Sequence, residues 1–548
     1  MTIRIIKYSA AALYVIFFAL LIYYSFYFKR TDILTGILFL SSFFFLSVFA
    51  IRKNPGLVDV CLFYSATISA VIISAAGFYG IITANSVRIS GILGDRAFEA
   101  EAAALIFVFI SARYVFRNEK KLNAFLSYVA LFLSAGYLTV LRSRTAYLSV
   151  FICFIVLAIL FLRARKADDN NFRSRLKKRV LVLVAIISIS AAAASLISFQ
   201  QPPERDSLKN LVSGMFNTEG ATNKSRIYFS KASLKMFVSH PLAGVGAGLW
   251  SGTYPMYEGK PFTDANIDVN SAVKAHNDFL ELISEYGVSG FFYILLIAGG
   301  LISLFRKFSK DIFYAPYIFV IICFSVSSLF GFPKDNMFAA LFFLTCLSAG
   351  FADTSKDYGK NRFALIAKIF LLVFIILSAG LLFMRNIIEK NYLEGINLKF
   401  KKDYRGSLEK LSEVNKVLFP VDRSGIPVDY YRGVMYFELR EYDKSLEAFE
   451  NASLIMPCYP TVMSNKASAF YKTGRISEAI ELYKEIQKLF PYFFEPQINL
   501  LAVYANEKRD KDAVSLLKDL ETVAMEPKFI KNYIVFSDIK NYYARKDL

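Results

Sequence analysis

The chain has 548 residues, a formal net charge of +19 and a composition that is 55% hydrophobic, and its mean hydropathy is +0.42. This apolar content exceeds that of soluble domains, and repeated apolar runs of roughly 20 residues indicate a multi-span helical membrane protein. The basic residues gather in short loops between these runs rather than on one face of a soluble domain, so we expect no nucleic-acid partner.

Cysteine and histidine usage limits the metal sites that the chain can form. Of the five cysteines, four lie inside apolar runs, and their spacing does not pair them. A disulfide framework or a cysteine metal site is therefore not indicated. The two histidines of the chain are too few for a histidine-rich centre, and we expect no metal and no other cofactor.

Eleven membrane spans are predicted. They cover residues 8–27, 33–50, 58–83, 102–116, 123–141, 146–162, 180–199, 288–305, 313–332, 337–352 and 363–383. The first follows the short basic segment 1–7, but it is too long for a signal peptide and further spans follow it, so we interpret it as a membrane helix. The expected fold class is all-α, a polytopic membrane helix bundle of about 11 spans followed by a soluble α-helical repeat domain.

Basic residues in the loops predict how the bundle is oriented. The segment from Arg163 to Arg179 is the most basic loop, which places it in the cytoplasm. Counting spans outward puts four further basic clusters on the same side, and only Lys29 and Arg30 on the other. The chain then divides into spans 1–7 (1–199), a large external loop with the candidate active site (200–287), spans 8–11 (288–384) and an external repeat domain (385–548).

The C-terminal part, 385–548, carries a repeat of 34 residues. Pro457 and Pro491 are one repeat apart, and small and aromatic residues recur at matching offsets: Gly395, Ser407, Gly433, Tyr436, Ser445, Phe449, Ala452, Ala467, Phe470, Ala479, Tyr483, Tyr504 and Ala513. This pattern is typical of tetratricopeptide repeats, in which small residues let two helices approach closely. Stacked repeats form concave surfaces, so we expect a module for docking a protein partner or for dimerisation.

The external loop contains a glycine-rich stretch from Pro241 to Trp250. A dinucleotide-binding loop is not favoured, because no strand precedes the stretch and no βαβ unit surrounds it. We predict a tight turn that follows a helix ending at Pro241.

A helical pattern begins just after His276 and leads into the eighth span. Asp278, Glu281 and Glu285 fall on or near one face of this helix, where they either orient His276 or shape the helix. Asn277 precedes it and is either a helix cap or a substrate contact. A lone histidine is usually structural. His276, however, is one of only two, lies on the predicted external side and borders an acidic face, so we predict a functional role.

The turn from Arg142 to Arg144 is a second unusual feature, because two arginines between apolar spans are costly if they face lipid. Either they extend to lipid head groups, or they hold an anion at the external surface. A guanidinium group matches a diphosphate in a forked, two-bond contact.

Taken in order, these pieces resemble the O-antigen ligase/polymerase family, which includes protein O-oligosaccharyltransferases. The matching residues are Arg88, Gly91, Ser143, Arg144, Thr145, Arg226, the segment 241–246, His276, Asn277, Leu280, Glu285 and Gly287. The resemblance covers about residues 80–350, is most specific at His276 and Asn277, and leaves the tetratricopeptide domain as an addition. It implies a fold of the lipid-sugar glycosyltransferase type in a bacterial inner membrane, with the large loop and C-terminal domain in the periplasm.

The resemblance also implies a metal-independent glycosyltransferase that uses a polyprenyl-diphosphate-linked glycan as donor, most simply an O-antigen ligase of lipopolysaccharide biosynthesis. His276 would orient the acceptor hydroxyl or accept its proton, while Arg144 and Arg226 stabilise the leaving diphosphate. Contacts to substrate are expected from Arg142, Arg88, Asn277 and Glu285.

The acceptor stays open at this point. A ligase would use lipid A-core, an O-antigen polymerase a glycan on its lipid, and a protein O-oligosaccharyltransferase a Ser or Thr hydroxyl. A glycan-lipid transporter is a different class of function. Few charged residues lie inside the predicted spans, which disfavours a transport path.

Overall fold

A computed structural model describes residues 47–48, 50–51, 54–84, 93, 95–164, 170–198, 221–257, 274–352, 362–422, 425–490 and 493–524. Within these ranges the regular structure is helical, with one isolated β-bridge between Val421 and Pro427. The all-α class is therefore confirmed for this part of the chain. The predicted span 8–27, nearly all of 33–50, and Arg88 lie outside the described residues.

Each of the other nine predicted spans coincides with a helix. These helices are α3 (Pro55–Ala84), α4 (Arg96–Phe116), α5 (Lys121–Leu141), α6 (Arg144–Ala164), α7 (Asn170–Ser198), α12 (Phe291–Phe308), α13 (Ala315–Phe330), α14 (Met337–Phe351) and α15 (Arg362–Phe400). In the described ranges, four segments are long and apolar enough to cross a membrane: Pro55–Tyr79, Lys121–Leu141, Asp278–Phe308 and Ile312–Phe330. The total of about eleven spans stays a prediction.

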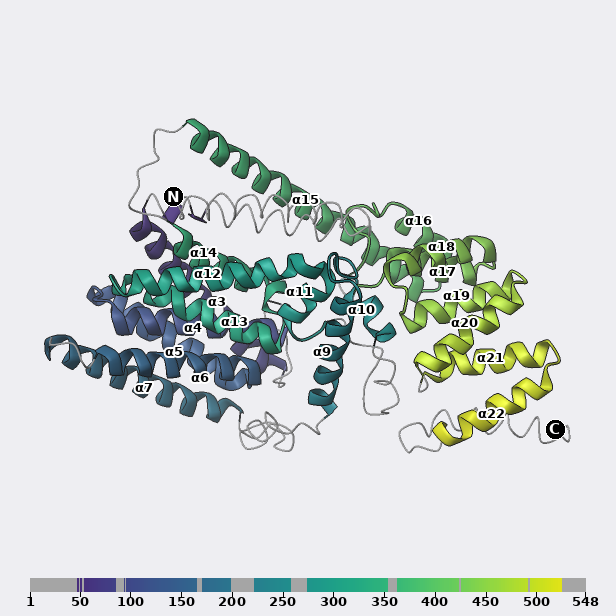
Figure 1. The fold of residues 1–548 in the computed structure, drawn as a ribbon, viewed down its shortest axis with the longest axis horizontal. Helices are drawn as coiled ribbons and strands as arrows, with labels where there is room; N and C mark the ends of the chain where they lie inside the picture. Colours follow the sequence, from purple (N-terminus) through teal and green to yellow (C-terminus); the bar gives the residue numbers. More distant parts are fainter. Residues whose placement is uncertain are drawn as a thin grey trace.

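Helix α4 is the centre of the bundle. It packs against α3, α5, α6, α7, α13 and α14, and its residues from Glu99 to Phe116 are all buried. Small residues, such as Ala100 and the run 102–104, are fully enclosed and let neighbouring helices approach closely. Figure 1 shows this bundle at one end of the molecule.

The predicted boundary at residue 385 falls inside one continuous helix. Helix α15 runs for 39 residues, from Arg362 to Phe400, so its second half already belongs to the C-terminal domain. The segment between 381 and 394 contains neither proline nor glycine, and nothing in it interrupts helical hydrogen bonding.

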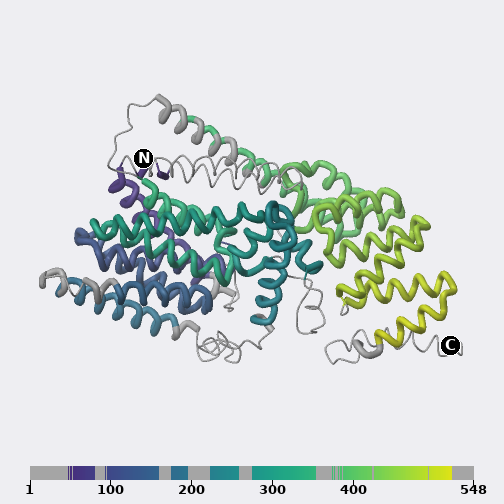
Figure 2. Tube along the Cα trace, viewed as in Figure 1, coloured from purple at the N-terminus to yellow at the C-terminus, as the bar shows by residue number. Residues whose placement is uncertain are grey.

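The end of α15 pairs with α16 (Tyr404–Ser412), and the helices after α16 pack in further antiparallel pairs. They are α17 (Val428–Glu438), α18 (Tyr442–Ile455), α19 (Pro460–Lys472), α20 (Ile476–Leu489), α21 (Phe494–Asn506) and α22 (Asp510–Ala524). The trace in Figure 2 shows the pairs side by side.

Equivalent contacts recur inside two of these pairs. Ser407 donates a hydrogen bond to the carbonyl of Gly395 at 2.8 Å, and Ser445 makes the same bond to Gly433 at 2.8 Å. A Cβ added at Gly433 would lie 2.6 Å from the ring of Phe449, so this position requires glycine. Recurring helical hairpins are thus observed, while their assignment as tetratricopeptide repeats stays a prediction.

Three helices of the 200–287 loop lie between the bundle and the C-terminal helices (Figure 1). They are α9 (Ala221–Ser239), α10 (Trp250–Thr253) and α11 (Asp278–Tyr286), the last of which continues through a 3-10 turn (Gly287–Gly290) into α12.

The C-terminal helices pack directly on α10. The backbone amide of Cys458 donates to the carbonyl of Gly252 at 2.9 Å, and Leu249 shares a buried apolar cluster with Val421, Ile455 and Met456. A Cβ at Gly252 would lie 2.9 Å from the Cα of Met456. The domain is therefore attached to the external loop through a close backbone contact as well as through α15.

This contact predicts the effect of Gly252→Val. The added side chain has no space against Met456, and overpacking of this kind costs roughly 1–3 kcal/mol. We expect a lower unfolding temperature and faster release of the C-terminal domain by a protease. Gly380→Val is the matched control, because a Cβ there meets nothing within 4 Å. Identical behaviour of the two variants would contradict the contact.

Candidate active site in the external loop

The glycine-rich stretch packs against the end of α11. Val245 and Gly246 donate backbone hydrogen bonds to the carbonyls of Ser284 and Glu285, at 2.9 and 3.1 Å. Gly244 has a φ of +69°, and a Cβ there would lie 2.2 Å from the carbonyl carbon of Glu285. Both the conformation and the space therefore require glycine, and the predicted tight turn is observed.

The side chain of Glu285 stabilises the same turn. Its buried carboxylate accepts a hydrogen bond from the backbone amide of Trp250 at 3.1 Å. The indole of Trp250 in turn donates to Ser233 at 2.8 Å and stacks on Tyr254, with ring centroids 4.4 Å apart. Glu285 thereby links α11 to α9 and α10, and a substrate contact through it stays a prediction.

His276 occupies the left-handed region of backbone conformation, with a φ of +54°, which is uncommon for a residue with a side chain. Its two neighbours are held by α11. Glu281 accepts from the amide of Ala275 at 2.9 Å, and Asn277 accepts from the amide of Leu280 at 3.0 Å. Asn277 is thus the N-cap of the helix, which is one of the two roles predicted for it. These bonds fix the position of the imidazole relative to the helix.

The imidazole of His276 lies between two phenylalanine rings, those of Phe332 and Phe229, with centroids 5.3 and 6.5 Å away. Burial lowers the pKa of His276 below its ordinary value, and the positive charge of Arg226 lowers it further, whereas Glu281 acts in the opposite direction. At neutral pH the ring is therefore uncharged and able to accept a proton.

Arg226 and Phe229 lie one helical turn apart on α9, which directs both side chains toward the same side. Burial lowers the pKa of the Arg226 guanidinium, and the nearby charge of Arg144 lowers it further. The Nε atom of Arg226 is buried and has no hydrogen-bond partner among the described residues. A buried donor of this kind is costly unless a ligand satisfies it.

The two arginines of the short turn lie at the junction of α5 and α6. Arg142 caps α5 with a φ of +48°, and Arg144 is the exposed first residue of α6. Electrostatic interactions connect Arg144 to Arg226 and Arg226 to His276. The structure therefore groups the three residues that the sequence assigns to catalysis.

One feature was not predicted from the sequence: a network of charges in which two lysines contact the buried carboxylates of α11 and the neighbouring Asp335. The Nζ atom of Lys334 contacts Asp278 at 3.0 Å and Glu281 at 2.6 Å, and that of Lys274 contacts Asp335 at 2.8 Å. Burial lowers the pKa of Lys334, but the three carboxylates outweigh it and hold the pKa well above its ordinary value. Glu281 belongs both to this network and to the bonds that hold His276.

The sequence does contain a feature that could have pointed to Lys334 and Asp335 as site residues. They form a charged pair between two apolar runs, on the side that span counting makes external. Such a pair is normally a solvated loop, and only the structure shows that it folds back against α11.

Residues 129–295 match a family model described as O-antigen ligase. This segment is similar to O-antigen ligases. The ligase segment contains Arg142, Arg144, Arg226, the glycine turn and α11 with His276, so it includes every site residue discussed except Phe332, Lys334, Asp335 and Arg88. A search of curated proteins found no match to the chain. The family and the apolar helices together indicate an integral membrane protein with a role in glycan transfer or ligation.

The charge network beside the ligase segment predicts that Lys334→Met is strongly destabilising. Removing Lys334 leaves the buried carboxylate of Asp278 without its lysine partner, and breaking a buried ion pair in this way typically costs about 3–5 kcal/mol. We expect a clear fall in the thermal unfolding temperature of the purified protein. The control is Lys310→Met, which removes an exposed lysine. If both variants unfold at the wild-type temperature, the network does not stabilise the site.

Proposed function

We propose that the chain transfers a glycan from a polyprenyl-diphosphate donor to an acceptor hydroxyl at the external face of the membrane, as an O-antigen ligase does. The observation that carries this proposal is the grouping of two arginines and one neutral histidine beside the glycine turn. The family of the segment 129–295 supports it.

The arginines are proposed to bind the diphosphate. In the reaction the acceptor oxygen attacks the anomeric carbon, the bond from that carbon to the diphosphate oxygen breaks, and negative charge develops on the leaving group. Arg144 and Arg226 repel each other in the free site, and an anion between them would relieve this repulsion and satisfy the buried Nε of Arg226. Fixed cations aimed at developing charge typically lower a barrier by about 3 kcal/mol each.

His276 is proposed to orient the acceptor hydroxyl and to accept its proton. Burial and Arg226 keep the imidazole neutral, which is the form that this role requires. The bonds made by Glu281 and Asn277 hold the backbone on both sides of His276. The imidazole is therefore already in position before the acceptor binds.

A metal-independent reaction is part of the proposal. The carboxylates of Asp278, Glu281 and Asp335 each contact a lysine ammonium group. Lysine therefore already supplies the counter-charge that a divalent cation would bring, which supports chemistry by the arginines and the histidine alone.

The position of the C-terminal helices bears on the class of acceptor. The C-terminal helices pack on α10, next to the glycine turn, so a protein bound by them would be held near the site. This contact favours the protein O-oligosaccharyltransferase as the runner-up to the ligase.

A deletion strain separates the alternatives. Loss of the long lipopolysaccharide ladder alone supports the ligase, and a single-repeat band supports the polymerase. Loss of glycoprotein staining supports the protein transferase.

Substitution at the proposed catalytic residues should abolish transfer. We expect His276→Ala and Arg144→Ala each to lower the rate by a hundredfold or more while the protein still accumulates in the membrane. Arg144→Lys should also be impaired, because lysine cannot form the forked contact. His240→Ala is the matched control, since this exposed histidine lies outside the site. Full activity of either alanine variant would remove that residue from the mechanism.

The lowered pKa of His276 predicts the acid limb of the pH–rate profile. A base loses activity when it is protonated, and a lowered pKa moves that event to more acidic pH. The rate should therefore stay constant as the pH falls from 7.5 and drop only below about 6.5, the ordinary value for histidine. Initial rates across the pH range measure this, and a midpoint above 7 would contradict a neutral His276.

A further inference from the structure

Helix α4 lies outside the ligase segment but begins next to the candidate active site. Asn336 donates a hydrogen bond to the carbonyl of Phe98 at 2.9 Å. The rings of Phe98 and Phe332 meet edge to face, with centroids 5.7 Å apart, and Phe332 lies 5.3 Å from the imidazole of His276. One aromatic ring therefore connects the first turn of α4 to the proposed catalytic histidine.

Glu101 follows Phe98 by three residues, so both side chains lie on the same side of α4. That side faces the loop after α13, where Phe98 contacts Phe332. Glu101 Oε1 lies 3.1 Å from the position that a Cβ would take at Gly331, and the methyl group of Thr145, in the first turn of α6, lies 3.8 Å from the same position. The carboxyl group of Glu101 is therefore held between this loop and the start of α6.

The carboxyl group of Glu101 is buried and incompletely hydrogen-bonded. The residue is 4% exposed, and its Oε2 atom has no hydrogen-bond partner among the residues that the structure describes. Lys334 interacts with it electrostatically, but the ammonium group of this lysine contacts Asp278 and Glu281. A buried carboxyl oxygen without a partner is costly, and a ligand that donates a hydrogen bond to it would remove this cost.

The charges around Glu101 favour a neutral ligand over a second anion. Its carboxyl group interacts more strongly with the like charges of Asp278 and of Asp335 than with the opposite charge of Lys334. A phosphate group would add to this repulsion, whereas a hydroxyl group carries no charge. A sugar hydroxyl both donates and accepts hydrogen bonds, so it matches a carboxyl group in either protonation state.

The two rings beside Glu101 suit the apolar face of a sugar. Phe98 and Phe332 are half-buried, so part of each ring is accessible to a ligand. The C–H groups of a pyranose ring pack well on an aromatic side chain, while its hydroxyl groups reach polar partners at the edge. Because Phe332 also contacts His276, a sugar bound here would lie next to the proposed site of transfer.

We propose that Glu101, Phe98 and Phe332 form a subsite for a sugar ring beside His276, in which Glu101 accepts a hydrogen bond from a sugar hydroxyl. The subsite rests on the proposed function, because it belongs to the same site. The sugar is part either of the donor glycan or of a carbohydrate acceptor. All three subsite residues lie outside the segment 129–295 that matches the ligase model.

The test measures the affinity of the purified full chain for polyprenyl diphosphate with and without its glycan. We expect Glu101→Gln to weaken binding of the glycan-bearing lipid by about fivefold or more, the effect of one lost hydrogen bond, and to leave the affinity for the glycan-free lipid within twofold of wild type. Unchanged donor affinity with a similar rise in KM for a carbohydrate acceptor would instead assign the sugar to the acceptor. Wild-type values of both quantities, or equal losses with both lipids, would overturn the subsite.

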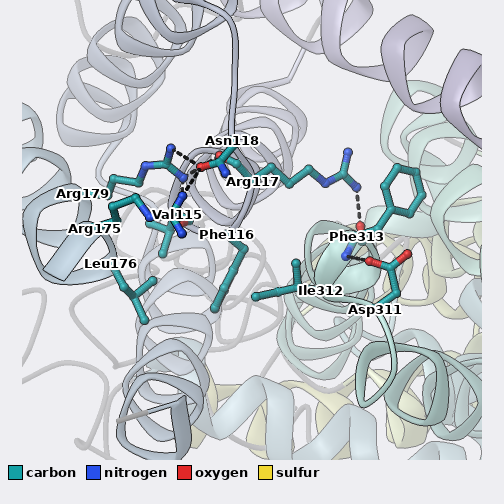
Figure 3. Close-up of a pocket in the computed structure, with 10 residues that line it drawn as sticks. All are labelled: Val115, Phe116, Arg117, Asn118, Arg175, Leu176, Arg179, Asp311, Ile312 and Phe313. Carbon is teal, nitrogen blue, oxygen red and sulfur yellow. Dashed lines mark hydrogen bonds between the residues drawn. The ribbon is translucent and has the colours of Figure 1, made fainter. Parts of the chain in front are cut away.

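Stability separates sugar binding from a purely structural role of Glu101. Its Oε2 has no hydrogen bond to lose within the described part of the chain, so ligand-free Glu101→Gln should unfold at or above the wild-type temperature. A clear fall in that temperature would assign Glu101 to packing and contradict the proposal. Asp311→Asn is the matched control, because it removes a carboxylate from the cavity of about 320 Å³ at the other end of α4 (Figure 3) and should bind each probe within twofold of wild type.

A third probe keeps the subsite distinguishable from the proposed function. This probe is the free oligosaccharide released from the lipid-linked glycan by mild acid. If the wild-type protein neither binds polyprenyl diphosphate nor transfers glycan, the proposed function fails. Binding of the free oligosaccharide that is lost in Glu101→Gln would then still support the subsite, and binding that is absent or independent of Glu101 would overturn it.

Discussion

The packing of the glycine turn on the end of α11 is the constraint on which the candidate site depends. Gly244 meets the backbone of Glu285 so closely that any side chain would clash, and the Glu285 carboxylate closes the same junction through Trp250. This junction sets the position of α9 relative to α11. Arg226 on α9 and His276 before α11 come together as a result, although 49 residues separate them in the sequence.

Around this junction the site contains carboxylates paired with lysines and, separately, two arginines that repel each other. On α11, Asp278 pairs with Lys334, and Glu281 pairs with Lys334 and Lys274, so these two carboxylates act as structural charges. Arg144 and Arg226 repel each other, and Arg226 retains a buried donor without a partner in the described part of the chain. The buried Nε of Arg226 is thus a donor suited to an anion, which is the chemistry that a diphosphate leaving group requires.

Local patterns predicted local features well. Apolar runs located nine helices, Asn277 was correctly offered as a helix cap, and the glycine-rich stretch was correctly interpreted as a turn. Features that depend on tertiary contact were missed. Lys334 looks like an ordinary loop residue until it folds back on α11, and Gly252 gives no sign that Met456, some 200 residues later, packs against it. The boundary predicted at 385 lies within α15, where helix-forming residues continue without a break, so the division into domains there stays a prediction.

The two arginines are proposed to bind the diphosphate, while His276 orients the acceptor hydroxyl and accepts its proton. Binding of a polyprenyl diphosphate without its glycan to the purified protein tests this division most directly. We expect Arg144→Ala and Arg226→Ala to weaken binding at least tenfold and His276→Ala to leave the dissociation constant within twofold of wild type. Equal affinity in all three variants, or a loss confined to His276→Ala, would contradict it.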